Sequence, residues 1–300
     1  MLTESITEAT KLAGVSDFVI FNGDCLDLLS SLPDHSMDLV ITSPPYFMNR
    51  EYDTSNDIED FRSIHSELAS QINRVVKPSG SICWQVGIFA KDGAITPLDY
   101  EVHTVFQKYF ILRNRIVWTF GHGMHARNRF SGRHETILWY SKSGDYFFDL
   151  DPVRVPQKYP GKRFYKGPNK GKLSGNPLGK NPGDVWDIPN VNSRHVEKEE
   201  HPCQFPVSLA LRLVKSLCPE GGLVLDPFAG TSTTGIACMM SKRKFLGSEL
   251  NPDYASISES RFNRYVEGTL PIRPDKPPAA PNRNQKVATL PEEFQRKRAG

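Results

Sequence analysis

The chain has 300 residues and a formal net charge of +3 at pH 7. Hydrophobic residues make up 38% and charged residues 24%, a globular composition that excludes disorder over the full length. No run approaches the roughly 18 apolar residues of a membrane span, and the N-terminus lacks the pattern of a signal peptide. The five cysteines are scattered without a CxxC pair, which excludes a disulfide framework and indicates the reducing cytoplasm.

The first half of the chain alternates buried strands with amphipathic helices. Residues 1–17 are expected to form a loosely packed N-terminal arm. Phe61, Leu68 and Ile72 belong to an apolar stripe that predicts a long helix, ended by KPSG at 77–80. The predicted strands are 18–21, 37–42, 81–86, 110–120 and 135–141, and the predicted helices 26–32, 61–75 and 98–108. This alternation favours an α/β fold, a doubly wound and mostly parallel sheet with helices on both faces.

Regular patterning stops in a loop-rich insert at residues 151–197. Its stretch 152–183 holds six prolines, six glycines and eight basic residues but no acidic ones. Strands are then expected at 222–228 and 244–250, and helices at 206–217, 231–241 and 252–266. Residues 268–300 are proline-rich, with seven basic and three acidic residues, and are predicted to be an extended or disordered tail.

The first motif with chemical content is Ser43-Pro44-Pro45-Tyr46, directly after a buried strand. Ligands of open α/β sheets lie beyond the carboxyl ends of the strands. The prolines stop the strand and leave the Ser43 hydroxyl and nearby carbonyls as acceptors, while Tyr46 offers a flat face to a planar ring. A base swung out of a duplex needs both. The alternative interpretation is a plain strand-terminating turn with a buried tyrosine.

The second motif is the stretch Asp226-Pro227-Phe228-Ala229-Gly230-Thr231-Ser232-Thr233, predicted as strand, turn and helix. Gly230 permits close backbone approach, and a helix N-terminus suits an anionic group. Glu249 ends the next predicted strand, where a carboxylate accepts hydrogen bonds from ribose hydroxyls. The alternative is an ordinary tight turn between strand and helix.

Together, TSPPY and DPFAGTST resemble the catalytic motif and the S-adenosylmethionine loop of the amino-specific DNA methyltransferases, which modify N4 of cytosine or N6 of adenine. The order of catalytic motif, basic insert and cofactor loop resembles the circularly permuted β class. The resemblance implies a catalytic half at 18–150, a target-recognition insert at 151–197 and a cofactor half at 198–267. It further implies the S-adenosylmethionine-dependent methyltransferase fold, no catalytic metal and double-stranded DNA as partner.

Two further segments fit this family. His201-Pro202-Cys203-Gln204-Phe205-Pro206 is similar to its HPxQxP segment, which implies cofactor contacts for His201, Pro202 and Phe205. Asp24 stands where the family contacts the adenosine end. The chain departs from the pattern at Ser232, where members often have glycine, and at Phe205, where many have lysine.

The letters Pro202-Cys203-Gln204 also occur around the nucleophile of cytosine-C5 methyltransferases. That family places its cofactor loop before this motif, whereas here the loop follows, and no ENV motif accompanies it. We therefore expect Cys203 to pack at the cofactor site rather than to attack a base. His201 and Cys203 also lack further ligands at zinc spacing.

Two basic clusters are expected to contact DNA phosphates, although a solvated surface is the alternative for each. The residues are Arg127, Arg129 and Arg133 in one cluster, and Lys158, Lys162, Arg163, Lys166, Lys170 and Lys172 in the insert.

The target base is the least determined feature. Serine at the first motif position is more usual in N4-cytosine members, which favours cytosine, and N6 of adenine is the alternative. An RNA or protein methyltransferase and an inactive DNA-binding relative also remain open. Family members often dimerise, and the sequence decides neither the oligomeric state nor whether a cognate restriction endonuclease is a partner.

Overall fold

The computed structural model describes residues 1–46, 58–91, 93–121, 123, 125–274 and 289–295. The chain divides into two units. The first, residues 1–148 with 184–273, contains the sheet and its helices. The second, residues 149–183 with 274–300, contains most of the basic insert.

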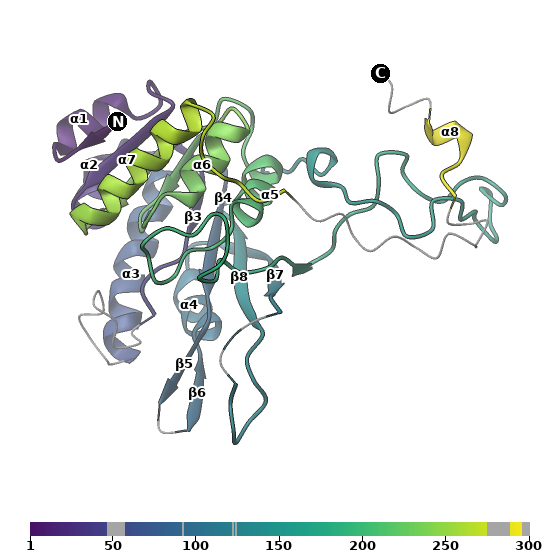
Figure 1. Ribbon diagram of the computed structural model, residues 1–300, viewed down its shortest axis with the longest axis horizontal. Helices are drawn as coiled ribbons and strands as arrows, with labels where there is room; N and C mark the ends of the chain where they lie inside the picture. The colour runs from purple at the N-terminus through teal and green to yellow at the C-terminus, as the bar shows by residue number, and fades with distance from the viewer. Residues whose placement is uncertain (47–57, 92, 122, 124, 275–288, 296–300) are drawn as a thin grey trace. The chain divides into compact units, whose positions relative to one another are not determined.

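A nine-stranded sheet forms the centre of the first unit (Figure 1). Of its strands only β8 is antiparallel to its neighbours, so the predicted mostly parallel sheet is confirmed. In spatial order the strands are β1 (Leu2–Thr3), β2 (Phe18–Asn22), β11 (Lys244–Glu249), β10 (Leu223–Asp226), β3 (Met37–Thr42), β4 (Val76–Val86), β8 (His134–Ser141), β7 (Ile111–Thr119) and β9 (Val185–Asp187).

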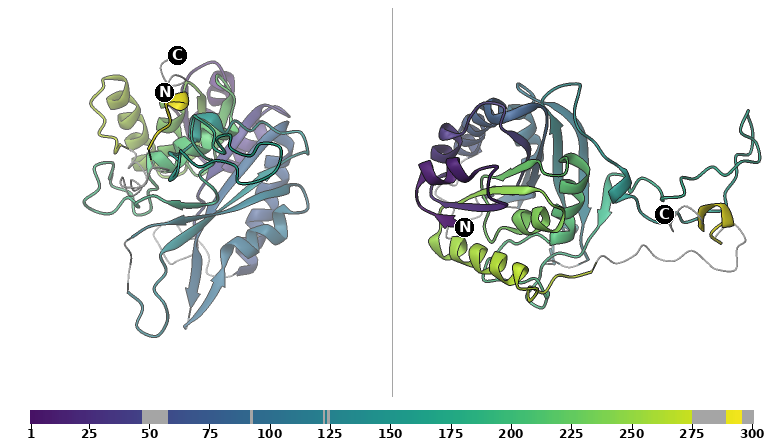
Figure 2. Two further views of the ribbon diagram at one scale, coloured as in Figure 1. Left: turned by 90° about the vertical axis from the view of Figure 1, so that its right-hand side faces the viewer. Right: turned by 90° about the horizontal axis from the view of Figure 1, so that it is seen from above.

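Helices cover both faces of this sheet because side chains along the buried strands alternate between two cores. In β3, Val40 belongs to one core, and Leu39 and Ile41 belong to the other. The first core packs against α1 (Ile6–Leu12), α2 (Cys25–Ser31), α3 (Ile58–Val75) and α4 (Leu98–Phe106), and the second against α5 (Val207–Leu217), α6 (Thr233–Met240) and α7 (Pro252–Val266) (Figure 2). No helix among the described residues is long and apolar enough to cross a membrane.

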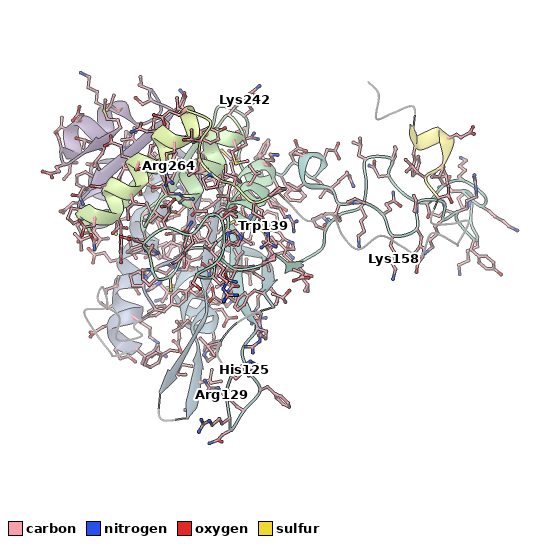
Figure 3. All side chains as sticks on the ribbon, in the orientation of Figure 1. His125, Arg129, Trp139, Lys158, Lys242 and Arg264 are labelled. Carbon is pink, nitrogen blue, oxygen red and sulfur yellow. The ribbon has the colours of Figure 1, made fainter. Side chains whose placement is uncertain are left out.

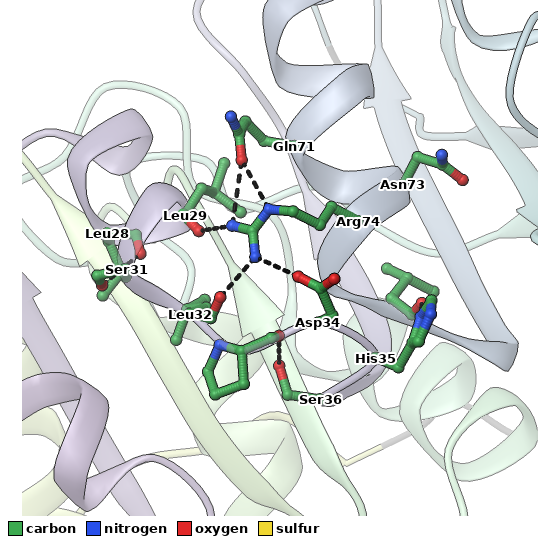
Figure 4. Close-up of polar contacts among 12 residues, drawn as sticks. Leu28, Leu29, Ser31, Leu32, Asp34, His35, Ser36, Gln71, Asn73 and Arg74 are labelled. Atoms are coloured by element: carbon green, nitrogen blue, oxygen red, sulfur yellow. Dashed lines mark hydrogen bonds and ion pairs between the residues drawn. The ribbon is translucent and has the colours of Figure 1, made fainter.

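An arginine of α3 caps the end of α2, where the last carbonyls of a helix lack partners (Figure 4). The Arg74 guanidinium donates to the carbonyl oxygens of Leu29 at 2.5 Å and Leu32 at 2.6 Å, and to the Asp34 carboxylate at 2.8 Å. The contact fixes α2 against α3. It thereby also helps to fix Asp24, which caps the other end of α2 by accepting from the Leu26 N–H at 2.7 Å.

The N-terminal segment is packed, so the prediction of a loose arm is wrong. The Met1 ammonium donates to the Phe18 carbonyl at 2.9 Å, β1 pairs in parallel with β2, and Ala9 of α1 is fully buried. The segment extends the sheet by one strand and covers the first core. The long helix α3 ends at Val75, as predicted from the stop at 77–80, but β4 begins at once at Val76 and so starts before the predicted strand 81–86.

Strands also lie in two further places where none was predicted. A hairpin of β5 (Ile88–Lys91) and β6 (Ala94–Pro97) follows β4. The predicted insert is too long, because residues 184–197 belong to the first unit: β9 pairs with β7, and Trp186 and Ile188 are buried in the second core. The Ile188 carbonyl accepts from the Trp118 indole N–H at 2.7 Å.

The second unit contains two antiparallel segments of chain with little regular structure. After a short 3-10 turn at Asp151–Val153, Val155 bridges Lys180 and Arg163 bridges Leu173, so the chain runs out and returns antiparallel. Of the predicted tail, residues 268–273 belong to the first unit, and α8 (Glu292–Gln295) forms one helical turn. The rest of the tail lies largely outside the described residues.

Candidate active site

Both sequence motifs reach one pocket at the carboxyl edge of the sheet. Strands β3 and β10 are neighbours, and from them the chain proceeds in opposite directions, to β4 and to β11. Ligands bind at such a switch point. A pocket of about 870 Å³ opens there, lined by Ser43–Tyr46, His201–Phe205, Pro227–Thr231 and Glu249. The sequence placed three of these segments at strand ends and His201–Phe205 before a helix, and the structure brings all four together.

Ser43 is oriented by a relay of hydroxyl groups. The Tyr46 hydroxyl donates to the Gln85 carbonyl at 3.3 Å. Because its proton is used there, the Ser43 hydroxyl, 3.0 Å away, donates to the Tyr46 oxygen. The Ser43 oxygen then presents lone pairs rather than a proton to the pocket. Tyr46 itself is only 8% exposed, so it contributes a mostly buried ring to the pocket wall.

Glu249 connects the end of β11 with the loop after β10. Its Oε2 accepts from the Gly230 N–H at 2.8 Å, and its Oε1 from the Asn251 N–H at 2.9 Å. Burial raises the pKa of Glu249 to about 7, against the lowering effect of these two bonds. Each oxygen keeps acceptor capacity toward the pocket, which suits the two hydroxyls of a ribose.

Asp226 lies beside the pocket rather than on its wall, contrary to the cofactor-contact role implied for it. It is 1% exposed, and it accepts from the hydroxyls of Thr42 at 2.6 Å and Thr234 at 2.7 Å and from the Phe228 N–H at 3.2 Å. Burial raises its pKa to about 6. Asp226 thus binds β10 to β3 and to α6 and holds the loop that lines the pocket.

Ser232 also stands behind the wall rather than on it. It is fully buried, its hydroxyl has no hydrogen-bond partner among the described residues, and its backbone is left-handed, with φ of 54°. The left-handed region suits glycine, the residue often found at this position in the family that the sequence resembles. The departure seen in the sequence is therefore a strained serine at the N-cap of α6.

Replacing Ser232 with glycine is expected to stabilise the protein. Glycine removes the left-handed strain and the unpaired buried hydroxyl, and this gain exceeds its greater chain entropy in the unfolded state. We expect about 1 kcal/mol, or a rise in Tm of about 2–4 °C. Calorimetry of the wild type and the variant measures the change in Tm. The control is Ser256→Gly, at an exposed position of α7, which is expected to lower Tm. An unchanged or lower Tm for Ser232→Gly would show that the turn is not strained.

Close packing fixes His201 over the loop. A Cβ added to Gly230, whose φ is 53°, would lie 3.1 Å from His201 Nε2, and the His201 ring meets the Tyr254 ring edge-on at 4.5 Å. The Cys203 N–H donates to His201 Nδ1 at 3.2 Å, which places the ring proton on Nε2. Pro202 and Phe205 line the same pocket, as does Asp24.

Several pocket residues were missed from the sequence, because they come from strands and helices without a motif. Gln85 of β4 donates its side-chain amide to Glu135 of β8, and both line the wall near Tyr46. His65 of α3 is buried, its Nε2 has no partner within the part of the chain that the structure describes, and desolvation lowers its pKa to about 4. The signals in the sequence were a polar Gln85 ending a buried strand and a histidine on an apolar helix stripe. The other missed wall residues include Trp118, Phe120 and Asn190.

The basic residues predicted to contact DNA lie in both units. Arg127, Arg129 and Arg133 belong to the loop between β7 and β8 in the first unit, where Figure 3 labels Arg129 beside His125. Those of the insert lie in the second unit, and their side chains are exposed: Lys158, Lys162, Arg163, Lys166, Lys170 and Lys172.

Comparison with known proteins identifies the family. The sequence profile of the N6 and N4 DNA methylases matches residues 37–260. The chain belongs to this DNA methylase family. It is 47% identical to the type II methyltransferase M.BglII of Bacillus subtilis over 80% of this chain and 67% of that one. It is 32% identical to the DNA adenine methyltransferase YhdJ of Escherichia coli, over 81% and 82%.

A solved structure supports the fold of this methylase. The chain is 29% identical to a DNA modification methylase from Thermus thermophilus solved with S-adenosyl-L-methionine, with a TM-score of 0.60 over 83% of this chain and 94% of that one. The DNA methylase described here therefore combines a parallel methyltransferase sheet with the permuted motif order, TSPPY on β3 before DPFAGTST after β10.

Proposed function

We propose that this methylase transfers a methyl group from S-adenosylmethionine to the exocyclic amino group of a base that is swung out of double-stranded DNA. The observation that carries the proposal is one pocket whose walls hold both an oriented acceptor, Ser43, and a carboxylate cradle, Glu249 with Gly230. N4 of cytosine is the favoured target, because of the serine at position 43.

The residues around Glu249 fit the cofactor. The Glu249 carboxylate accepts from the ribose hydroxyls, and Asp24 lies on the same wall for the adenosine end. A side chain at position 230 would crowd His201, which together with Phe205 bounds the methionine end. The bound cofactor supplies a sulfonium methyl group, and carboxylates on the wall favour its positive charge.

The residues after β3 prepare the target amino group. Its lone pair is delocalised into the ring, so the nitrogen is a poor nucleophile. The Ser43 oxygen and the Pro44 carbonyl accept its two hydrogens and draw the nitrogen toward tetrahedral geometry, while Pro45 stiffens the turn and Tyr46 contacts the ring. Positioning and preorganised dipoles then lower the barrier, and the surplus proton leaves afterwards through the acceptors.

Cofactor affinity is expected to rise with pH between 6 and 8. The pKa of Glu249 is raised to about 7, and only its ionised form accepts from both ribose hydroxyls. Protonation at pH 6 therefore weakens binding about tenfold relative to pH 8. The folding stability of the protein without cofactor has the opposite pH dependence. A raised carboxyl pKa adds stability that is complete below about pH 4.5 and is lost as the pH rises through about 7.

Calorimetric titration with S-adenosylmethionine at pH 6 and pH 8 measures this difference. The variant Glu249→Gln is the control, because the amino group of the cofactor titrates equally with both proteins. We expect the pH ratio of the variant to be close to one. An equal pH ratio in wild type and variant would assign the pH dependence to another group.

Neutralising Lys162, Arg163 and Lys166 to glutamine is expected to flatten the salt dependence of DNA binding. Each lost phosphate contact lowers the slope of log K against log salt by about 0.9. Fluorescence anisotropy at several salt concentrations measures the slope. The matched control neutralises Lys11, Lys108 and Lys242, which stand before the amino ends of strands. Equal slopes for both triple variants would make the insert a solvated surface.

Nucleoside mass spectrometry tests the activity and the base. The protein is incubated with S-adenosylmethionine and unmethylated genomic DNA, and the digested DNA is analysed. N4-methylcytosine supports the favoured target, whereas N6-methyladenine supports the alternative, toward which the name of YhdJ points. If neither product forms, the same assay on RNA and a cofactor titration separate an RNA enzyme from an inactive DNA-binding relative.

The remaining proposals concern partners and place of action. We propose a cognate restriction endonuclease, since M.BglII is named a type II methyltransferase. We also propose a homodimer, which only the resemblance to the family supports. Light scattering of the purified protein and a test of whether its product resists a co-encoded nuclease decide these two points. All five cysteines are free thiols, which suits action in the reducing cytoplasm.

A further inference from the structure

One aromatic side chain of the first unit lies almost wholly in water. Phe130 is 99% exposed, more than any other large hydrophobic residue of the described chain. It lies in the loop between β7 and β8. A phenylalanine held wholly in water lacks the favourable burial that such a side chain normally gains. Single exposed apolar residues are common on protein surfaces, so it is the loop that carries Phe130, together with its charge, that indicates a partner.

The loop connects this residue with the candidate active site. Trp118 and Phe120, at the end of β7, and Glu135, at the start of β8, line the pocket. The Phe120 N–H donates to the Arg133 carbonyl at 3.0 Å, which closes the base of the loop. The loop that carries Phe130 is thus flanked at both ends by residues of the pocket wall.

The tip of the loop has its own brace. The Ala126 N–H donates to the Ser131 hydroxyl at 3.1 Å, across the turn that carries Arg127, Arg129 and Phe130. Arg133 donates to the Gly132 carbonyl at 2.7 Å and approaches His125 at 3.4 Å. These bonds limit the freedom of the tip and present the phenyl ring on a supported turn.

The charge around the ring indicates the chemistry of its partner. Residues 120–134 include three arginines and no acidic residue, and Arg127 and Arg129 are exposed beside Phe130. Cations suit phosphates, and a flat apolar ring suits the faces of stacked bases. A protein or membrane partner would need a larger apolar surface than one ring.

We propose that Phe130 inserts into the base stack of the DNA, at the step that the target base leaves. The inference rests on the proposed function, since a gap arises only if a base is extruded. Phe130 then compensates for part of the lost stacking, while Arg127 and Arg129 hold the adjacent phosphates. It is a positioning residue, because it acts on the target base through the neighbouring stack.

The test compares Phe130→Ala with Phe130→Tyr on two duplexes that contain the recognition site. One duplex has the target base paired, and the other has an abasic site opposite it, which lowers the cost of extrusion. On the paired duplex we expect Phe130→Ala to lower kcat/KM about tenfold to hundredfold and Phe130→Tyr to lower it less than threefold. On the abasic duplex, Phe130→Ala is expected to come within about threefold of wild type.

Three controls keep the outcome specific. Val15→Ala is the control for the loss of an exposed apolar side chain, because Val15 lies before the amino end of β2. Phe130→Ala should also keep the wild-type Kd for S-adenosylmethionine. Arg129→Ala should weaken binding to both duplexes equally, because a phosphate contact is independent of the opposite base. Equal losses of Phe130→Ala on both duplexes, no loss on either, or a change of oligomeric state that accounts for the loss would each overturn the proposal.

A second readout separates this proposal from the proposed function. With 2-aminopurine in place of a target adenine, or pyrrolo-cytosine in place of a target cytosine, fluorescence reports extrusion without methyl transfer. Lower fluorescence for Phe130→Ala than for wild type supports insertion even if no methylated product forms. Equal fluorescence overturns insertion even if the wild-type protein methylates DNA.

Discussion

Replacing Tyr46 with alanine is expected to lower kcat about 100-fold or more while S-adenosylmethionine still binds with its wild-type affinity. Two effects combine. The ring face against the target base is lost, and the relay that turns the Ser43 proton away from the pocket is broken. The adenosine end of the pocket, around Glu249 and Asp24, is unchanged. Single-turnover methylation together with calorimetric titration of the cofactor measures both quantities.

The variant Tyr46→Phe separates the two effects. It keeps the ring but removes the hydroxyl between Ser43 and the Gln85 carbonyl, so we expect a loss of about tenfold, typical of one hydrogen bond. Because Tyr46 is largely buried, the alanine variant is also expected to melt earlier, and assays belong well below its Tm. Activity like that of wild type in Tyr46→Ala would remove Tyr46 from the mechanism.

The second large effect is expected at Glu249. The variant Glu249→Gln should weaken S-adenosylmethionine binding at pH 8 at least about 100-fold, because hydrogen bonds to a charged carboxylate each contribute about 1.5–3 kcal/mol. Glutamine also has one acceptor too few, since both carboxylate oxygens already accept a backbone N–H, from Gly230 and Asn251. The loop after β10 therefore loosens as well. Calorimetric titration gives the affinity, and the Tm without ligand gives the loosening.

A surface glutamate provides the comparison. Glu220, between α5 and β10, forms an exposed ion pair with Lys242 at 3.2 Å, and Glu220→Gln is expected to change neither affinity nor Tm measurably. If Glu249→Gln bound the cofactor as Glu220→Gln does, the ribose hydroxyls would be held elsewhere in the pocket.

The sequence was sufficient to predict that the segments at strand ends meet in one pocket. TSPPY, Glu249 and the loop after Asp226 follow buried apolar runs, and parallel strands bring such ends to one edge. The side to which each carboxylate turns was not predictable. Asp226 and Glu249 both end strands, yet Thr42 and Thr234 draw Asp226 into the interior while Glu249 lines the pocket.

Contacts between distant elements account for the other differences. Gln85 meets Glu135 because β4 and β8 pair antiparallel, a register that no local pattern encodes. The N-terminal segment is held by pairing with the edge of β2 and by Ala9 in the first core, and neither contact can be read from residues 1–17 alone. Trp186 and Ile188 follow a stretch rich in proline and glycine, which concealed β9.

During synthesis on the ribosome, β3 cannot pair with β10 until translation has reached β10. The bond between Thr42 and Asp226 joins residues 184 positions apart. At about 5–20 residues per second, translation takes about 10–40 s to cover that distance. During this interval β3 has emerged with one edge unpaired, and an unpaired apolar edge is prone to aggregation. The nascent chain therefore exposes this apolar edge for longer than a methyltransferase whose central strands are consecutive in sequence.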